Sequence, residues 1–421
     1  MNYKNSRKPA SAAGQPIFPA VADSLTPESL QHLLAEQART AALAFGVALV
    51  QQDVERLCGP LFARKATQGW AWRGGSEESN IVVDGGRVTF RRPRVRDRDG
   101  EVGLPVLAKL QDRDLLDGQI RERMLRGVST RNYEPVVAEY SRKTGISKAS
   151  CSRAFIRASQ KTLDELNHSD LSRHRFIALM VDGVEYAGRV VIVALGVTDT
   201  LQKVPLGVRE GDTENADVVR DLLAGIQERG FQLHCERLLA VIDGSKALRR
   251  GLVDVFGARV IIQRCWLHKL RNLKAYVPRQ HHAQLHWRMK KLMGLVRHDE
   301  ALRELESFAH WLSQVSHDGA ASLREAGHEL ITVHALGVPR NLRKALSTTN
   351  LIESLIGVVR ERTARVKNWK SRKTGQILRW VAASLKQHQS RMRRLRGNRE
   401  VAALIEALGG PRQIAIQAEV A

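Results

Sequence analysis

Two apolar segments of the sequence each end in an Asp-Gly dipeptide. They read LMVDG, which contains Asp182, and AVIDG, which contains Asp243. Side chains at the carboxyl ends of strands in an α/β sheet emerge into a crevice, where functional groups gather. Asp-Gly is also a good turn sequence, and for either dipeptide alone a turn is a sufficient explanation. The pair, in a chain with a large excess of basic residues, instead favours two carboxylates that act together.

Paired carboxylates in a protein that acts on nucleic acid most plausibly hold two Mg²⁺ ions, about 3.5–4 Å apart. One ion activates the attacking water or 3′-hydroxyl, and the other stabilises the leaving oxygen. Hard oxygen ligands suit Mg²⁺, with Mn²⁺ as a substitute, and not zinc. We therefore expect Asp182 and Asp243 to be metal ligands and catalytic residues.

A third acid is needed, and Glu353 in STTNLIESLIGVVRER is the best candidate. Helical spacing places Glu353 on one face with Asn350 and Arg360, while the apolar residues face the opposite way. Glu353 also lies three residues after Asn350, as in a capping box, and this role does not exclude metal binding. We expect Glu353 to complete the catalytic and metal-binding set.

A cysteine and a histidine, Cys265 and His268, lie two residues apart in QRCWLHKLRN. A zinc site would need two more ligands, for which His281, His282 and His286 are available, but there is no second closely spaced cysteine pair. A thiol nucleophile has no part in phosphoryl transfer. The favoured interpretation is structural: the pair follows the last strand of the sheet and braces its junction with the next segment, near the active site.

The charge balance favours a polyanionic partner. Lys and Arg total 67 against 44 Asp and Glu, a formal net charge of +23. Residues 360–399 alone contain 14 Lys or Arg and one acid, Glu361. A solvated helical face is the simpler explanation, but charge this one-sided repels itself unless phosphates lie nearby. Double-stranded DNA is the expected partner.

Four scattered cysteines form no disulfide framework, and the polar N-terminus shows no signal-peptide pattern. No continuous apolar run approaches the length of a membrane span, since VVIVALGV is among the longest. These features predict a soluble, cytoplasmic protein without a membrane partner.

The N-terminal third combines helices with a basic hairpin. Residues 1–25 are expected to form a flexible tail, and residues 26–114 a long core-facing helix, which begins after a capping Thr26, followed by a β-hairpin. Five arginines cluster behind the hairpin turn, where they suit either DNA or an ordinary exposed edge strand. Residues 115–170 have the pattern of a helix-turn-helix, although plain helical pairs share it.

The remainder alternates strands and helices. From residue 175 the order is βββαβαβ, which is that of a ribonuclease-H-like sheet. The predicted catalytic domain comprises residues 171–264 and 347–385. Residues 265–346 interrupt it with helical spacing alone and are predicted to be an all-helical insertion. Residues 386–421 form a basic C-terminal segment.

Basic and polar residues of three regions are predicted to contact DNA: the helix-turn-helix, the surroundings of the Cys-His pair, and the basic run after Glu353. They are Arg131, Lys148, Ser150, Arg153, Arg264, Lys269, Arg271, Arg360, Arg365, Lys367, Lys370 and Arg372.

Four motifs together resemble a known family. GVREGDTENADVVRDLLAGIQERG, VIDGSKALRR, QRCWLHKLRN and TTNLIESLIGVVRER appear in the order found in Mutator-type transposases of bacterial insertion sequences. The resemblance spans about residues 127–369. It implies a ribonuclease-H-like domain with an Asp-Asp-Glu triad at Asp182, Asp243 and Glu353, and a Cys-x-x-His motif at Cys265 and His268.

The resemblance further implies Mg²⁺-dependent hydrolysis at the terminal inverted repeats of an insertion sequence, then strand transfer into target DNA by a two-metal mechanism. Synapsis of two ends implies a homodimer or higher oligomer, associated with the bacterial nucleoid. A structure-selective nuclease on the same fold and a catalytically silent DNA-binding regulator are the alternatives. The first leaves the helix-turn-helix and the insertion unexplained, and the second leaves the triad idle.

Overall fold

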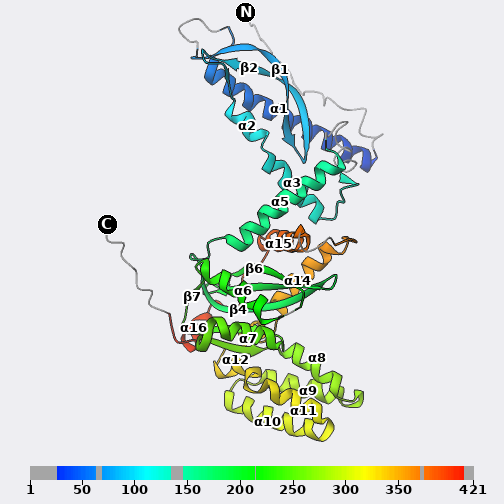
Figure 1. The fold of residues 1–421 in the computed structure, drawn as a ribbon, viewed down its shortest axis with the longest axis vertical. Coiled ribbons are helices and arrows are strands. Elements are labelled where there is room, and N and C mark those ends of the chain that lie inside the picture. The colour runs from blue at the N-terminus through cyan, green and yellow to red at the C-terminus, as the bar shows by residue number, and fades with distance from the viewer. Residues whose placement is uncertain (1–25, 63–68, 134–145, 214, 370–373, 412–421) are drawn as a thin grey trace, which may run out of the picture. The chain divides into compact units, whose positions relative to one another are not determined.

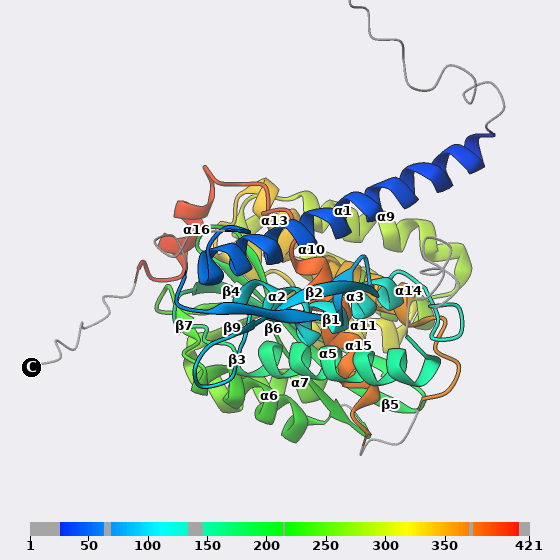
Figure 2. The ribbon, with the colours of Figure 1, turned by 90° about the horizontal axis from the view of Figure 1, so that it is seen from above.

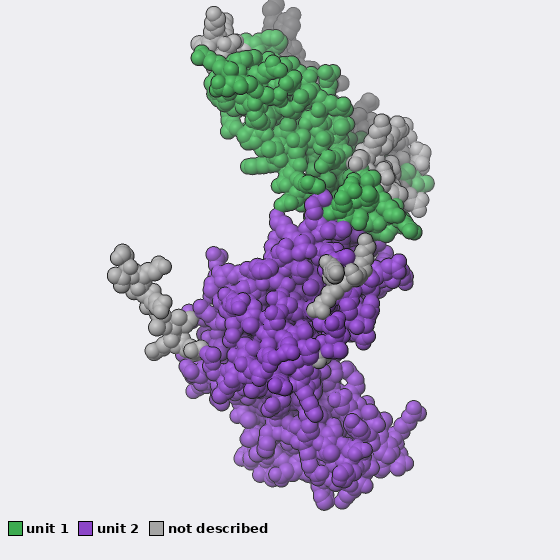
Figure 3. Space-filling model, in the orientation of Figure 1, with its two compact units in different colours: residues 1–120, 128–154 green, residues 121–127, 155–421 purple. Residues whose placement is uncertain are grey.

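The computed structural model describes residues 26–62, 69–133, 146–213, 215–369 and 374–411. The chain forms two compact units (Figure 3). Unit 1 contains residues 1–120 and 128–154, and unit 2 contains residues 121–127 and 155–421. The predicted flexible tail lies outside the described residues, and the predicted domain limits remain predictions.

Unit 1 begins with the long helix α1, Pro27–Cys58, whose N-cap is Thr26 and whose first residue is proline, as predicted. Only its C-terminal half is core-facing, where Val50, Val54 and Leu57 are buried against the hairpin. The N-terminal half exposes apolar side chains such as Leu30 and Leu34. The prediction of a core-facing helix is therefore wrong for this half, because no described element covers it.

The segment Ser29–Cys58 of α1 is long and apolar enough, by length and composition, to cross a membrane. This is weak evidence, because core helices of soluble proteins pass the same test. The continuous apolar runs of the sequence do not reveal it, since charged and polar residues interrupt the helix.

Strands β1, Trp72–Val83, and β2, Gly86–Arg96, form the predicted hairpin, and the short β3, Glu101–Val102, extends it. Asp84 and Gly85 both have positive φ, as a two-residue turn between twisted strands requires. Arg92 and Arg94 pair with Glu77 and Glu101. These two arginines of the basic hairpin are thus balanced by acids of the same sheet.

Helix α2, Pro105–Leu110, and helix α3, Arg113–Leu125, follow the hairpin. Helix α5, Lys148–His168, is the predicted second helix of the helix-turn-helix, and the hydroxyl of Ser147 accepts a hydrogen bond from the N–H of Ser150 at its start. Most of the predicted first helix lies in residues 134–145, outside the described residues. The helix-turn-helix therefore stays a prediction.

Unit 2 is built on a mixed six-stranded sheet, of which Figure 1 labels β4, β6 and β7. Its central strand order is β6-β5-β4-β8-β9. Strands β4 to β6 pair antiparallel, whereas β8 pairs parallel with both β4 and β9. The short strand β7 pairs parallel with β4. The bounds are β4 Arg175–Tyr186, β5 Arg189–Thr198, β6 Lys203–Gly211, β7 Gln232–Leu233, β8 Leu238–Ile242 and β9 Val260–Arg264.

Helices cover both faces of this sheet. Helix α6, Ala216–Glu228, and helix α7, Lys246–Phe256, lie side by side (Figure 2) and share one apolar core with the sheet. Asn215 and Ser245 cap them. The opposite face packs against helix α14, Asn350–Thr363, and helix α15, Gln376–Gln389. The predicted order of three strands, helix, strand, helix and strand is confirmed, apart from the added β7 and the 3₁₀ turn Gly257–Arg259.

Between β9 and α14 the chain is helical throughout, and all of this stretch is described. Its buried leucines and aromatic residues continue the core of the α14 face. A short helix α16, Val401–Ala407, follows α15. The intervening helices are α8 Trp266–Tyr276, α9 His282–Gly294, α10 His298–Val315, α11 His317–Ala326, α12 Thr332–Ala335 and α13 Arg340–Leu346, with 3₁₀ turns at Arg279–His281 and Gly327–Leu330.

Candidate active site

Asp182 lies in β4, and Asp243 follows the last residue of β8. These strands are parallel neighbours, with Met180 opposite Val241. Extending this register by two residues places Asp182 beside Asp243. Both strands are mostly apolar and buried. The prediction that the first strand ends at Asp182 is wrong, because β4 stays paired with β5 as far as Tyr186, whereas Asp243 does follow the end of β8.

The two aspartates influence each other electrostatically. Burial and the charge of Asp243 raise the pKa of Asp182 from its ordinary value near 3.8 to about 7, with a further contribution from Glu353. The charge of His268 and the hydrogen bond that the Gly183 N–H donates to Asp182 oppose this rise. Several carboxylates therefore converge on one partly buried place, where a bound cation would relieve their repulsion.

Glu353 reaches the same place from α14. Ile352, Leu355, Ile356 and Val359 of this helix are buried against the sheet, as predicted, and Glu353 lies on the more open side. The predicted capping box is wrong. The helix begins at Asn350 with Thr349 as its N-cap, so Glu353 is one residue too far along for the reciprocal capping contact.

The hydroxyl of Thr349 lies at the centre of a polar cluster. It is 2.6 Å from Glu353 Oε1 and 3.2 Å from His268 Nδ1. A hydroxyl has one proton, and the shorter distance assigns it to the Glu353 carboxylate. His268 Nδ1 and Cys265 Sγ, 3.2 and 3.3 Å from the same oxygen, complete the cluster, and the hydrogen bond from Thr349 holds the Glu353 side chain.

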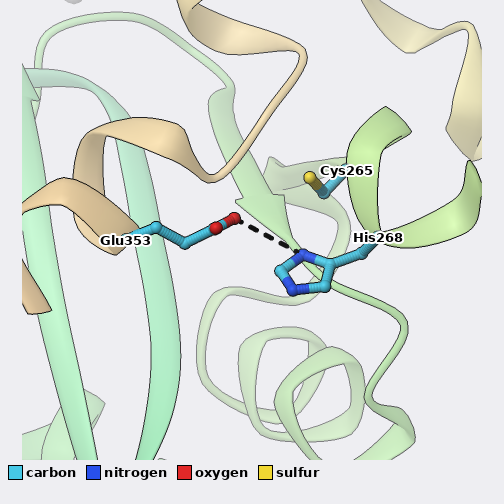
Figure 4. Close-up of side chains that lie close together, drawn as sticks. All are labelled: Cys265, His268 and Glu353. Atoms are coloured by element: carbon cyan, nitrogen blue, oxygen red, sulfur yellow. Dashed lines mark ion pairs between the residues drawn. The ribbon is translucent and has the colours of Figure 1, made fainter. Parts of the chain in front are cut away.

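Cys265 anchors this cluster to the sheet. It follows β9 directly, and its N–H donates to the carbonyl of Ile242, the residue before Asp243. Its sulfur accepts a hydrogen bond from the Thr349 N–H at 3.3 Å. The Cys-His pair therefore lies where the chain leaves the sheet for the helical segment, in contact with Thr349 where the chain returns, and it faces the Glu353 carboxylate (Figure 4).

The cysteine and histidine also affect each other's protonation. Burial raises the pKa of the Cys265 thiol, but hydrogen bonds with His268 and Thr349 outweigh it and lower the pKa overall. The hydrogen bond with Cys265 raises the pKa of His268, and the charge of Glu353 adds to this effect. The pair is thus electrostatically coupled to the third acid.

Cys265, His268 and Glu353 could also hold a metal ion, because their ligand atoms all lie within 4.8 Å of one another. Of the predicted additional ligands, His282 contacts the carbonyl of Val277 and His281 contacts Gln280. A four-ligand zinc site is therefore not assembled here. The three carboxylates do not meet the same spacing among the described residues, which a site for two ions does not require.

Two of the predicted DNA contacts are corrected by the structure. Arg264 and Lys269 are buried, and both contact Glu325 of α11. Lys269 also donates to the carbonyl of Ser322. These residues tie the end of β9 and the start of α8 to the helical segment, and their charges are not available to a DNA backbone.

The other predicted contacts that the structure describes are on the surface or partly so. Arg271 is exposed, and its Nη2 lies 3.8 Å from Glu353 Oε2, beside the carboxylates. The remaining members are Arg131, Lys148, Ser150, Arg153, Arg360, Arg365 and Lys367. Lys370 and Arg372 lie outside the described residues.

Sequence reasoning did not identify Thr349. Its signal was its position, four residues before Glu353, which is one helical turn. The side chains of all three residues of STT, 347–349, are buried; the Ser347 carbonyl accepts from the Trp266 N–H, and the Thr349 N–H donates to Cys265. A polar triplet buried before a functional helix was the observation to use.

Comparisons with known proteins agree with the resemblance seen in the motifs. The family model described as Transposase, Mutator family, matches residues 22–392. The chain is 26% identical over 258 residues to the transposase for insertion sequence element IS6120 of Mycolicibacterium smegmatis, covering 60% of this chain and 78% of that protein. It is 25% identical over 338 residues to the transposase for ISRM5 of Rhizobium meliloti, covering 76% and 80%.

Proposed function

Because this chain belongs to the Mutator family of transposases, we propose that it cleaves DNA at the ends of an insertion sequence and joins them to target DNA. Asp182, Asp243 and Glu353 are the proposed catalytic residues. The observation that carries this proposal is the position of Asp182, within β4, beside Asp243, directly after the neighbouring parallel strand β8, with Glu353 on a helix packed on that sheet.

The strand order supports a ribonuclease-H-like core. Three antiparallel strands are followed by two parallel ones, and the first strand, β4, lies at the centre beside the fourth long strand, β8. This arrangement brings residues 61 positions apart to the same edge. The helical segment after β9 then separates Glu353 from the aspartates in sequence without separating it in space.

The donor atoms suit Mg²⁺, or Mn²⁺, at this edge. Asp182, Asp243 and Glu353 offer hard carboxylate oxygens, and the raised pKa of Asp182 reflects negative charge that a cation would offset. When bound, two such ions activate the attacking oxygen and stabilise the leaving oxygen. The protein's own part is to hold the three carboxylates in place before DNA arrives.

Thr349 and His268 hold the third carboxylate. The hydroxyl of Thr349 donates to Glu353 Oε1, which restricts rotation of the side chain. Arg271 lies on the other side of that carboxylate, near Oε2. Its exposed guanidinium is suited to a phosphate of the DNA strand at the reacting bond.

Recognition of the terminal inverted repeats is proposed for the start of α5. Lys148 and Arg153 are exposed there, and Ser150 is partly exposed. A helix that presents such residues from its first turns can reach base edges in the major groove. Synapsis of two DNA ends favours a dimer or a larger assembly.

A cleavage and joining assay tests the proposal. Labelled duplexes carrying the ends of the insertion sequence are incubated with the full chain and Mg²⁺, together with unlabelled target DNA. Transposase activity predicts a nick at the element boundary and a longer joined product, and EDTA abolishes both. Cutting of branched DNA without joining would replace the proposal with a nuclease. Binding without any cutting would replace it with a DNA-binding regulator.

A further inference from the structure

Unit 2 contains a cavity of about 440 Å³ at the C-terminal end of α14. Its lining is mainly basic and includes none of Asp182, Asp243 and Glu353. Helices α3, α14 and α15 all end beside it. Four arginines line it, against the single carboxylate of Glu361: Arg126, Arg362, Arg365 and Arg391.

The helix ends explain part of this gathering of arginines, because helix C-termini carry partial negative charge. The carbonyl and carboxylate acceptors at these helix ends pair with only some of the arginine N–H groups. Arg126 donates to Glu122, Arg362 to the carbonyl of Ser384, and Arg365 to the carbonyl of Gly127. Arg391 has no side-chain acceptor among the described residues. Each guanidinium has five N–H donors, so most remain for a ligand.

Basic side chains outnumber acidic ones in the lining of the cavity. The pKa of Arg362 is lowered by burial and by the charge of Arg391, and the charges of Glu122 and Glu361 oppose this. The pKa of His388, another lining residue, is lowered by burial and by the charges of Arg362, Lys203 and Arg391. These like charges repel one another, and an anion in the cavity would remove that repulsion.

One rim of the cavity is held in place by the backbone. Gly127 has φ +102°, a region that favours glycine, and a Cβ there would lie 2.6 Å from Arg365 Nη1. The guanidinium of Arg365 therefore rests directly on the glycine and is tied to its carbonyl. This is a preformed position for an arginine that would otherwise be mobile on the surface.

We propose that this cavity is a second DNA contact, which holds a backbone phosphate away from the reacting bond. The inference rests on the proposed function. Arginine forks bind phosphate in a bidentate manner, and Arg360 and Lys367 in the same part of the chain are also exposed. Arg362 lies nine residues beyond Glu353, about 13.5 Å along the helix and on a different face, so the phosphate held there is not the one that reacts.

The experiment measures DNA binding by fluorescence anisotropy over a series of KCl concentrations, using a labelled duplex of unrelated sequence and the full chain. Arg391→Gln should weaken binding about 3-fold to 10-fold and reduce the slope of log K against log[salt] by about 0.9, the value for one lost phosphate contact. Gly127→Ala, which displaces Arg365, should act in the same direction. Arg391→Lys should recover part of the slope.

Arg250→Gln is the matched control, because it removes the same charge from an exposed position on α7, at the opposite face of the sheet. Arg250→Gln should leave the DNA affinity and the slope of log K against log[salt] unchanged. If Arg391→Gln and Gly127→Ala behave like this control, the proposed contact is wrong. If both variants bind DNA normally but lose stabilisation by pyrophosphate at matched ionic strength, the cavity binds a free anion, which also overturns it.

Cleavage assays separate this proposal from the catalytic one. At saturating DNA, Arg391→Gln should cleave at the wild-type rate, because the cavity contributes to binding and not to the reacting bond. Loss of cleavage at saturation with unchanged affinity would contradict the cavity's role. If Arg391→Gln reduces the salt slope as predicted but the wild-type chain never cleaves DNA, the proposed function is refuted and the proposed phosphate contact is retained.

Discussion

Helix α14 carries opposite functions at its two ends. Its first turn delivers Glu353 to two aspartates, and the cavity after its last turn is lined by arginines. The acidic end is assembled by the sheet edge and by buried polar contacts, whereas the basic end is assembled where three helices finish. If both proposals hold, catalysis and DNA affinity are separable along one helix, and substitutions at its two ends should have different effects.

The largest effects should come from the acidic end. Asp182→Asn, Asp243→Asn and Glu353→Gln preserve shape but remove the negative charge proposed to hold the metal ions, so each should reduce the cleavage rate by about 1000-fold or more. DNA affinity without divalent metal should stay within about twofold of wild type. Cleavage by all three variants at the wild-type rate would show that the triad is assigned wrongly and would end the comparison.

A smaller effect is expected from the residue that positions Glu353. Thr349→Val keeps the shape of the side chain but removes the hydroxyl, so Glu353 loses its 2.6 Å contact. Misplacement of a catalytic group by about 1 Å costs up to about 100-fold, and we expect a loss of about 10-fold to 100-fold in single-turnover cleavage. Thr349→Ser, which restores the hydroxyl, should recover most of the rate.

A purely structural role for Thr349 gives a different result. It would lower the melting temperature equally in the valine and serine variants and leave the cleavage rate at saturating Mg²⁺ unchanged. That outcome would show that Thr349 does not position Glu353 for cleavage.

The next effect in size is expected on the melting temperature, because burial and the charges of the neighbouring acids destabilise ionised Asp182. The folded-state pKa of Asp182, about 7, lies above its ordinary value near 3.8. The contribution of protonated Asp182 to the stability of the folded chain is therefore fully present below about pH 4 and is lost as the pH rises through 7. Asp182→Asn mimics the protonated form, so in EDTA it should raise the melting temperature at pH 8 and change it little at pH 4.

The expected rise is a few degrees, since about 1 kcal/mol moves the melting temperature of a domain of this size by about 2–4 °C. Differential scanning fluorimetry at the two pH values measures it. A lower melting temperature at pH 8 would mean that Asp182 is stabilised by its surroundings, and that the acids do not repel one another.

The smallest effect should come from Cys265→Ser. Serine keeps an acceptor for the Thr349 N–H in nearly the same place, so the return of the chain to the sheet is preserved. Cleavage should fall by no more than about threefold, and Mg²⁺ dependence should stay the same. A loss as large as that of Glu353→Gln would place the thiol itself in the chemistry.

The two ends of α14 also differ in how well the sequence predicts them. The apolar runs before the two Asp-Gly dipeptides predict neighbouring strands that bring Asp182 and Asp243 together, although β4 continues past Asp182 to Tyr186. Glu353 followed from helical periodicity, although the cap beside it was placed one residue late. The helical segment was predicted from the absence of strand patterns, since helices alone fill it.

The contacts that join distant segments could not be predicted in this way. Arg264 and Lys269 look like DNA-binding residues in a basic stretch, but their partner Glu325 is more than 50 residues away. Arg126 and Arg391 meet in one cavity only because α3 and α15 end at the same place. Charge runs give the amount of charge, and only packing determines which charges are neutralised.

The most direct test of the account is the location of bound metal. Crystals of the chain with an element-end duplex and Mn²⁺ give anomalous difference peaks at the ions. The account predicts two peaks among the carboxylates of Asp182, Asp243 and Glu353. A peak at Cys265 Sγ and His268, with none between the two aspartates, would contradict it.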